Sequence, residues 1–390
     1  MSEKKEKKIS NVPTLRFSQY HSDWTPCSLS EIANVVGGGT PDTADETLWN
    51  GDIQWFTPTE VGHSKYVSKS IRTISQRGLK KSSAKILPKG SILLSSRATV
   101  GECSIAQNDC TTNQGFQSLV PKTTVNNEFL YYLAQTKKRH FIKYASGSTF
   151  LEISNSEIEK TKCFIPRIEE QTKSAEFLSL IDRKLEVQNK IIRKYETLIK
   201  GIRHKIFSSV SNGEDVTLGS FLEEYSEKNT ENNLQSVAVG KYGIRKREDI
   251  YSKELSSDYS KNKVIRKDTL IIGMGSTQID IGILTTDNCY CVSPAYTTYH
   301  IKGIDSFYLQ EYLIDLNPLL SVRYMVTSAR QGKTVNKDDL MQHILVIHSD
   351  LAQKEIHQFF QRIYGGLLIE KRMLSALQKQ KSFLLQSMFI

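Results

Sequence analysis

The sequence predicts an α+β protein in which two similar globular domains are each followed by one long α-helix. Three observations predict this plan: an internal repeat, a heptad pattern at the end of each repeat, and short β-rich runs mixed with an amphipathic helix inside each domain. We expect these boundaries: a disordered tail at 1–13, a first domain at 14–167, a spacer helix at 168–210, a second domain at 211–349 and a second spacer helix at 350–390.

The repeat is clearest from the end of each domain through the helix that follows it. Phe207 and Phe389 lie 182 residues apart, and at the same offset Gln171 meets Gln353 with no gap between them. Upstream the similarity continues at drifting offsets, as expected when loops of different length interrupt one fold. There we align Lys89–Leu94 with Lys267–Ile272, Gly115–Phe116 with Ala295–Tyr296, Phe129–Leu133 with Leu309–Leu313, and Ser146–Thr149 with Gln331–Thr334.

Both helical segments carry mainly apolar residues at alternating spacings of four and three, the heptad spacing of a coiled coil. The seam positions are Ile181, Leu185, Gln188, Ile192, Tyr195, Ile199, Ile202 and Ile206 in the first segment, and Ile363, Leu367, Glu370, Leu374, Leu377, Lys381, Leu384 and Met388 in the second. A helix of about 40 residues is roughly 60 Å long, too long for a compact domain. We therefore expect the helices to pair antiparallel with pseudo-twofold symmetry, although one such stripe could also pack on its own domain.

Inside the domains, turn residues separate short runs that have the composition of β-strands. We predict strands at Ile53–Phe56, Ser91–Ser95, Phe116–Val120, Lys267–Ile272 and Ile279–Leu284, and helices at Asn127–Tyr144 and Phe307–Val322. The elements follow the same order in both halves, which supports the repeat.

The chain is basic: its 390 residues include 52 Lys and Arg against 42 Asp and Glu, a net charge of +10. A basic excess indicates a polyanionic partner, most often nucleic acid and sometimes a membrane surface or an acidic protein. No apolar run is long enough to span a membrane, and the charged segment Met1–Ser10 lacks the apolar core of a signal peptide. None of the six cysteines forms a C-x-x-C pair, and we expect Cys289 and Cys291 to be buried reduced thiols of a cytoplasmic protein.

Three short motifs resemble catalytic signatures, and we reject each of them. Ser293-Pro-Ala-Tyr296 has an alanine where adenine methyltransferases carry a second proline, and no glycine-rich cofactor loop precedes it. Gly332-Lys-Thr334 lacks the leading glycine of a P-loop, because that position holds Thr327. Asp182-Arg-Lys184 has a nuclease-like spacing but lies in the predicted coiled coil, where carboxylates could not converge on a metal. We therefore expect a chain that is not an enzyme and holds no metal or cofactor.

Basic, amide, hydroxyl and aromatic side chains recur in the loops of both predicted domains. Arg and Lys neutralise phosphates and can read guanine, whereas Asn and Gln can read adenine. A single charged loop is usually only solvated surface, so the argument depends on the recurrence. The candidate DNA contacts are Thr40, Trp55, Thr57, Lys65, Arg77, Lys80, Arg97, Asn113 and Gln114 in the first domain, and Tyr242, Arg245, Lys246, Arg247, Lys261, Lys263, Gln278, Tyr296, Arg330 and Lys333 in the second.

From about Trp24 to Phe389, the sequence resembles the specificity subunit of type I restriction–modification systems. The resemblance is carried by Trp24–Ile32, Gly37-Gly-Gly-Thr-Pro41, Gly51–Trp55, Arg97-Ala-Thr-Val-Gly101, Asn113–Phe116, Ile165-Pro166 with Gln171, and Ile181-Asp182. The second domain departs from this pattern: it lacks both glycine-containing strings and shows Ile272–Thr277 near the position of the second one. Two domains that read different half-sites would diverge in this way.

The resemblance implies a non-catalytic DNA reader in which each target recognition domain recognises one half of a bipartite sequence. It implies that the helices set the spacing and dock two modification subunits, which carry S-adenosylmethionine and methylate adenine. It also implies restriction subunits that join with ATP and Mg. Two other interpretations stay open: a self-contained DNA methyltransferase or nuclease, and a coiled-coil adaptor without a DNA role.

A polar residue stands near the centre of each seam, Gln188 in the first helix and its repeat mate Glu370 in the second. In an antiparallel pair these two would face each other, and one polar layer fixes register at some cost in stability. We predict that Gln188→Leu combined with Glu370→Leu raises the midpoint of thermal unfolding and alters spacing or partner assembly. Unchanged spacing and assembly without a rise in the midpoint would refute the hypothesis.

Overall fold

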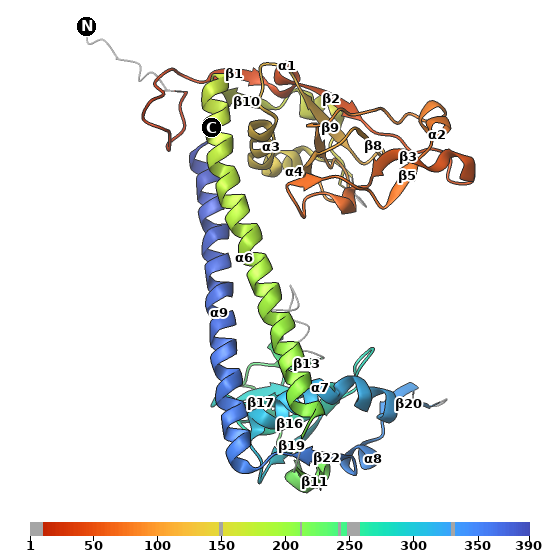
Figure 1. The fold of residues 1–390 in the computed structure, drawn as a ribbon, viewed down its shortest axis with the longest axis vertical. Coiled ribbons are helices and arrows are strands. Elements are labelled where there is room, and N and C mark those ends of the chain that lie inside the picture. Colours follow the sequence, from red (N-terminus) through yellow and green to blue (C-terminus); the bar gives the residue numbers. More distant parts are fainter. Residues whose placement is uncertain (1–10, 148–150, 211–212, 241–242, 248–257, 329–331) are drawn as a thin grey trace. The chain divides into compact units, whose positions relative to one another are not determined.

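The computed structural model describes residues 11–147, 151–210, 213–240, 243–247, 258–328 and 332–390. The chain divides into two compact units, Met1–Asn189 with Arg372–Ile390 and Lys190–Lys371. Each unit contains one α+β domain and a part of both long helices, α6 (Ile168–Ser208) and α9 (Asp350–Ser387) (Figure 1). The predicted fold class is confirmed.

The first domain combines a larger and a smaller sheet. Its elements are β1 (Thr25–Ser28), α1 (Leu29–Ile32), β2 (Ala33–Gly37), η1 (Glu46–Leu48), β3 (Trp49–Phe56), η2 (Pro58–Glu60), β4 (Tyr66–Val67), β5 (Arg72–Ile74), α2 (Gln76–Lys80), β6 (Ile92–Leu94), β7 (Cys103–Ala106), β8 (Cys110–Thr112), β9 (Gln117–Pro121), α3 (Asn127–Thr136), α4 (Lys138–Tyr144), α5 (Asn155–Glu159) and β10 (Lys162–Ile165). The larger sheet has the order β2-β9-β6-β7-β4 and the smaller one β5-β3-β8. β1 pairs antiparallel with β10, which joins the start of the domain to the strand that leads into α6.

The second domain repeats four strands of the larger sheet, without a counterpart of β4, and its other described strands form two-stranded pairs. Its elements are β11 (Glu214–Thr217), η3 (Leu218–Phe221), β12 (Leu222–Tyr225), β13 (Val237–Gly240), β14 (Gly243–Lys246), β15 (Lys263–Ile265), β16 (Thr269–Gly273), β17 (Asp280–Leu284), β18 (Tyr290–Val292), β19 (Thr297–Ile301), α7 (Ser306–Tyr324), β20 (Met325–Ser328), β21 (Gly332–Val335), α8 (Lys337–Met341) and β22 (Ile344–Ile347).

The sheet topology demonstrates the repeat more directly than the sequence does. The larger sheet of the second domain has the order β12-β19-β16-β17, which matches β2-β9-β6-β7 strand for strand. The pairing of β11 with β22 matches that of β1 with β10, and in both domains this pair leads into a long helix. These four strands and the strand pair that leads into each long helix are therefore repeated.

At the start of each long helix, a buried glutamine forms hydrogen bonds that connect this helix to the main helix of its domain. The side chain of Gln171 donates to the carbonyl just before α6 at 2.9 Å and accepts from the backbone N–H of Asn126 at 3.0 Å. Gln353 makes the same two bonds, to the carbonyl just before α9 at 2.8 Å and from the backbone N–H of Asp305 at 3.3 Å. The sequence repeat at Gln171 and Gln353 thus marks a pair of equivalent hydrogen-bonded links.

The N-caps of α3 and α7 correct the predicted alignment of these helices by one residue. Asn126 accepts from the backbone N–H of Phe129 at 3.0 Å, and Asp305 accepts from that of Tyr308 at 2.7 Å. Phe129 is therefore equivalent to Tyr308, and its predicted alignment with Leu309 is wrong. Neighbouring positions of both helices are apolar or aromatic, so side-chain type alone does not fix the register.

The predicted seam is present in the burial pattern of both long helices. Every seam residue is buried or half-buried, whereas the flanking cations Arg183, Lys184, Lys190, Arg193 and Lys194 are exposed. Gln188 is 7% exposed and Glu370 is half-buried, so both polar positions belong to the seam. Their mutual pairing stays a prediction.

Within each unit the two helices run antiparallel. In the first unit Lys381 of α9 forms an ion pair with Asp182 of α6 at 2.7 Å. In the second unit Lys371 pairs with Glu196 at 2.9 Å, and further along α6 the partner on α9 is an earlier residue: Arg203 donates to the hydroxyl of Tyr364 at 2.7 Å.

An aromatic residue near the end of each helix packs into the domain of the other repeat. In the first unit the ring of Phe389 lies 5.1 Å from that of Phe129 and 6.2 Å from that of Trp24. In the second unit the ring of Phe207 stacks on Tyr312 at 4.6 Å. Each domain core therefore includes the start of one long helix and the end of the other.

The structure corrects three further expectations. The predicted helix at 127–144 is two helices that meet at Lys137, whose backbone N–H closes α3 by bonding to Leu133 and Ala134. Cys291 is buried but Cys289 is exposed, so they are not a buried pair. Of the predicted tail, residues 1–10 lie outside the described residues, whereas Pro13 is buried against the domain.

No helix in the described part of the chain is both long and apolar enough to cross a membrane.

We predict that Gln171→Ala and Gln353→Ala each lower the free energy of unfolding by roughly 1–3 kcal/mol, because each leaves a buried backbone donor and acceptor unpaired. The matched control is Gln378→Ala, at an exposed position of α9, which should change little. Denaturant unfolding of the full chain measures the difference. Equal stability of all three variants would show that the links are not needed.

Candidate nucleic-acid interface

Two loops of the first domain enclose a hollow of about 240 Å³. The loop from β6 to β7 contributes Arg97 and Ala98, and the loop from β8 to β9 contributes Asn113, Gln114 and Gly115. Three candidate contacts that are distant in sequence are therefore brought together: Arg97, Asn113 and Gln114.

The backbone of the β6–β7 loop is held in a defined shape. Ala98 has a φ of 63°, in the left-handed region that residues other than glycine rarely adopt. The hydroxyl of Ser95 bonds to the carbonyl of Arg97 at 3.1 Å, and Gly101 has a φ of 84° where a Cβ would collide with a side chain of α4. The loop presents the Arg97 side chain, which is 45% exposed and lies 3.8 Å from the carboxylate of Glu152.

The glycine run before Thr40 allows a second loop to lie against this hollow. A Cβ on Gly38 would be 2.0 Å from the carbonyl of Asn113, so only glycine permits the contact. The hydroxyl of Thr40 donates to the exposed side chain of Gln114. The side-chain oxygen of Asn113 accepts from the backbone N–H of Gly115 at 2.9 Å and shapes the turn. Gln114 is thus the amide presented beside Arg97.

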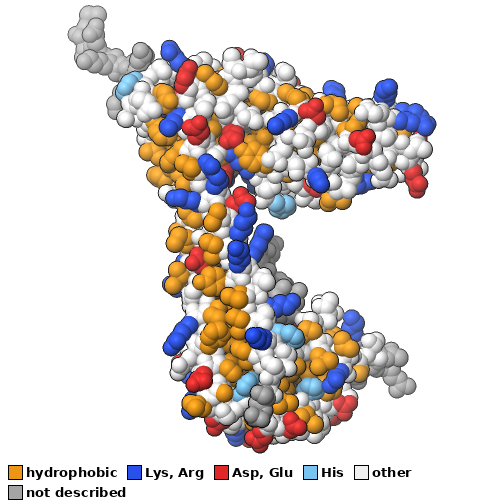
Figure 2. All heavy atoms as spheres, in the orientation of Figure 1, with side chains coloured by type: hydrophobic (Ala, Val, Ile, Leu, Met, Phe, Trp, Pro, Cys, Tyr) orange, Lys and Arg blue, Asp and Glu red, His pale blue; other side chains and the backbone are white. Residues whose placement is uncertain are grey.

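Basic side chains also gather at the tip of the first domain, over α2 (Figure 2). Arg77 and Lys80 are exposed there, as a phosphate contact requires. The sequence missed Arg72, which lies 3.6 Å above the ring of Trp49 in a cation–π contact and is exposed at the same tip. The spacing of Arg72 from Trp49 in the sequence gives no signal of this stacking.

Two candidates of the first domain are structural. Trp55 is 4% exposed, its indole N–H donates to the carbonyl of Gly39 at 2.9 Å, and its ring meets that of Trp49 edge-on. Its predicted contact with DNA is therefore wrong. The hydroxyl of Thr57 donates to the carboxylate of Glu60 at 2.7 Å and caps η2, so this side chain is already used inside the fold.

Lys65 is also a structural residue. Its side chain is 9% exposed, and its amine forms an ion pair with Glu128 at 2.9 Å and a hydrogen bond to Tyr132 at 3.0 Å. Desolvation lowers the pKa of this amine, although the nearby Glu128 carboxylate opposes the shift. The predicted DNA contact at Lys65 is wrong, because the amine faces the interior.

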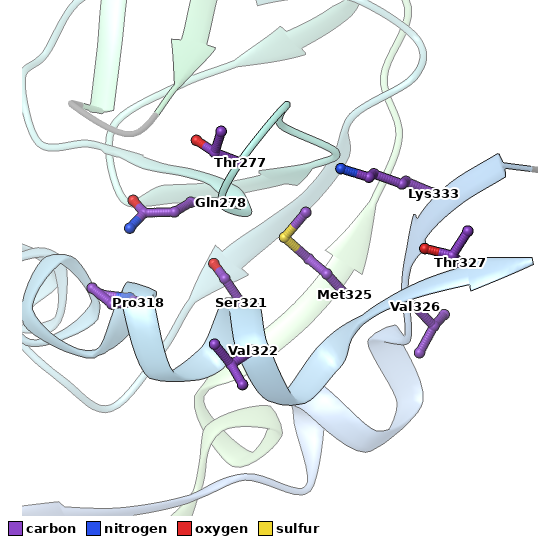
Figure 3. A pocket seen from close by; sticks show the side chains of 9 residues that line it. All are labelled: Thr277, Gln278, Pro318, Ser321, Val322, Met325, Val326, Thr327 and Lys333. Carbon is purple, nitrogen blue, oxygen red and sulfur yellow. The ribbon is translucent and has the colours of Figure 1, made fainter.

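The second domain has a hollow of about 460 Å³ that is lined by α7, the β16–β17 loop and the β20–β21 hairpin (Figure 3). It brings together two candidates, Gln278 and Lys333, and the amine of Lys333 donates to the carbonyl of Ser276 at 3.3 Å. The sequence missed the rest of the lining, which includes Thr277, Pro318, Ser321, Val322, Met325, Val326 and Thr327. Val322 is 84% exposed at the rim.

The two hollows share one equivalent loop, but other elements complete them: the β8–β9 loop in the first domain, and α7 with the β20–β21 hairpin in the second. The β6–β7 and β16–β17 loops join strands that occupy the same positions in the two sheets. The first loop contributes Arg97 and the second contributes Gln278. The scaffold is therefore shared, and the chemistry at the loop differs.

Two candidates of the second domain support the fold. The amine of Lys263 donates to the carbonyl of Tyr296 at 2.7 Å. The ring of Tyr296 covers Gly273, where a Cβ would be 2.2 Å away, and its hydroxyl donates to the carbonyl of Val239 at 3.2 Å. Both side chains are half-buried and support the fold, and their predicted contacts with DNA stay predictions.

Three of the remaining candidates lie on or directly after β14: Arg245 and Lys246 are exposed, and Arg247 is half-buried. Lys261 is exposed just before β15. Tyr242 and Arg330 lie outside the described residues.

The motifs rejected on sequence have structural roles. Ser293–Tyr296 is a turn that is closed by a backbone hydrogen bond of 3.1 Å, Gly332-Lys-Thr334 lies in the hairpin strand β21, and Asp182 pairs with Lys381 between the helices. Within the described ranges, no three His, Cys, Asp or Glu side chains are grouped closely enough to hold a metal ion.

Comparison with known sequences identifies the first half of the chain. Residues 21–197 match the model of the family described as type I restriction modification DNA specificity domain. A stretch of 200 residues is 38% identical to the type I restriction enzyme MjaIX specificity subunit of Methanocaldococcus jannaschii and covers 50% of this chain and 44% of that relative. A stretch of 203 residues is 24% identical to the EcoR124I/EcoR124II specificity subunit of Escherichia coli and covers 47% and 50%. The chain thus aligns with about half the length of these relatives.

Solved structures match nearly the whole chain. The type I restriction–modification S subunit from M. genitalium aligns with a TM-score of 0.55 at 16% identity, over 97% of this chain and 99% of that one. A chain from a structure on the assembly and conformational transition of the type I R-M system aligns with a TM-score of 0.59 at 15% identity, over 93% and 96%. At such identity these matches establish the fold alone. Residues 21–197 are thus similar to the type I restriction modification DNA specificity domain, and the chain has the fold of the solved S subunits.

Proposed function

We propose that this chain recognises DNA for a type I restriction–modification complex, with each domain reading one half of a bipartite target. One observation carries the proposal: the two domains share the order of four strands in the larger sheet, and an equivalent loop lines a hollow in each domain, but the side chains there differ. A reader of two unlike half-sites needs a common scaffold with different loops.

The hollow of the first domain suits the reading of base edges. Arginine can form two hydrogen bonds with guanine, and glutamine can form two with adenine. Arg97 and Gln114 present these groups side by side, with Arg77 and Lys80 on the same domain to contact phosphates.

The hollow of the second domain offers a different set of groups. Gln278 and Lys333 supply an amide and a cation, while the exposed Val322 can contact the methyl group of thymine. Arg245 and Lys246, both exposed on β14, would contact phosphates.

The long helices carry apolar side chains that the fold leaves exposed (Figure 2). In the first unit they are Leu180, Val187, Met373 and Phe383, and in the second Leu198, Leu351, Phe359, Leu368 and Ile369. Contiguous exposed apolar surface is typical of protein interaction sites. We propose that two modification subunits dock there and that restriction subunits join the complex.

Catalysis belongs to these partners in this proposal. S-adenosylmethionine would bind to the modification subunits, and ATP with Mg to the restriction subunits. The isolated chain should bind none of them, which separates it from a self-contained methyltransferase or nuclease. An absence of specific DNA binding by the chain, alone and with its modification subunits, would favour an adaptor without a DNA role.

The direct test is to map adenine methylation on DNA modified by this chain together with its modification subunits. We expect one bipartite motif with a spacer of fixed length. Arg97→Ala should relax one half-site and weaken discrimination there by roughly 5- to 150-fold, since one bidentate contact contributes about 1–3 kcal/mol.

The matched control is Lys122→Ala, an exposed cation at the other end of β9 from Gln114. This variant should methylate the unaltered motif. A motif that is unchanged by Arg97→Ala, or altered equally in both halves, would contradict the assignment of Arg97.

A further inference from the structure

Where each domain meets the long helices, a tyrosine, a carboxylate and a cation form a polar cluster. In the first unit the hydroxyl of Tyr132, on α3, donates to Asp182 of α6 at 2.5 Å. Lys381 of α9 lies 2.7 Å from the other oxygen of that carboxylate. Tyr132 is fully buried, and the side chains of Asp182 and Lys381 are 16% and 21% exposed. Lys65 also reaches Tyr132, but its ion pair is with Glu128.

The second unit has the same three groups. The hydroxyl of Tyr364, on α9, donates to Glu311 of α7 at 3.0 Å. Arg203 of α6 lies 2.8 Å from the same carboxylate and donates to Tyr364 at 2.7 Å. Glu311 is 1% exposed, so its charge depends on Arg203 for compensation.

The two clusters are related by an exchange. The N-caps make Tyr132 equivalent to Glu311, and the helix repeat makes Asp182 equivalent to Tyr364, 182 residues later. In the first unit the tyrosine lies on the domain and the carboxylate on the helix that follows it. In the second unit the carboxylate lies on the domain and the tyrosine on the helix. In both units the cation comes from the other helix, whose end packs on that domain.

The cations also occupy different positions in the two long helices. The repeat mate of Lys381 is Ile199, and the repeat mate of Arg203 is Leu385, so the two cations occupy positions one helical turn apart. Ile199 is 3% exposed, and Leu385 packs against the core of the first unit. Each helix end thus has an apolar residue where the other has its cation.

A mismatched pairing would fail at both clusters. If the end of α6 packed on the first domain, Ile199 would face Asp182, and Arg203 would enter the apolar site of Leu385. If the end of α9 packed on the second domain, Leu385 would face the buried Glu311. Either arrangement leaves a carboxylate without its cation and places a cation among apolar side chains, and both are unfavourable.

We propose that these clusters form a pairing code: each domain accepts the helix end of the other repeat and rejects the equivalent end of its own. Two like halves, contributed by two copies of the chain, would therefore not pair. The code concerns the assembly of the chain and does not depend on what the domains bind.

A graft within the full-length chain tests the code, because the helix repeat has no gap. In the first variant, residues 372–390 are replaced by a copy of residues 190–208. In the second, the same graft retains Lys381 and Leu385. The first graft should lower the midpoint of thermal unfolding by roughly 5–10 °C. It should also reduce amide-exchange protection in α3, and the second graft should recover most of both.

The matched control is the same graft with Gln378 and Lys379 retained, at exposed positions of α9. This control should behave like the first graft. The code is overturned if the first graft is as stable and as protected as the wild type, or if the control recovers as much as the second graft.

A point substitution keeps the code testable if the grafts do not fold. Lys381→Met should lower the midpoint, and Lys379→Met should not. In the double variant Asp182→Asn with Lys381→Met, the loss should be smaller than the sum of the single losses, since the two residues share one interaction. Additive losses, or no loss from Lys381→Met, would overturn the code.

Discussion

The packing of each helix end into the domain of the other repeat is the interaction on which the rest of the structure depends. A long isolated helix gains little stability from propensity alone and needs tertiary contacts. Gln171 and Gln353 hold the start of each helix, while Phe389 and Phe207 hold the ends. Each domain is thereby fixed to both helices, so its loops have a defined orientation on the helices of its own unit.

Within each domain, the elements that hold the fold together are distinct from the loops whose side chains differ between the two repeats. The order of four strands in the larger sheet and the glutamine links at the start of each long helix are the same in both repeats, whereas the loops between equivalent strands differ in length, backbone conformation and side chains. The β6–β7 loop depends on the φ of Ala98 and on Gly101, and it does not contribute to the seam of the helices. Loop residues can therefore change while the scaffold stays intact, as the proposed reading of two unlike half-sites requires.

The scaffold could be predicted well from the sequence, because the spacing of apolar residues shows which face of a helix is buried. The 4–3 spacing located the seam, and Gln171 and Gln353 proved to be equivalent links. The surface was harder to predict, because a lysine or tryptophan in a loop looks the same whether it faces solvent or the interior. The partners that bury Lys65 lie on α3 and α6, far along the chain, and no local pattern reveals them. The hollow beside Gln278 was missed for the same reason, because α7 and a hairpin complete it.

The proposed function requires the paired helices to hold two DNA-reading domains at a fixed separation. The most direct measurement is the spacer length of the methylated target after four residues are inserted into each helix, at the equivalent junctions 189–190 and 371–372. Four residues add roughly 6 Å, about one turn. The spacer should lengthen by about one or two base pairs of ~3.4 Å, with both half-sites unchanged. A spacer that keeps its length would contradict the account.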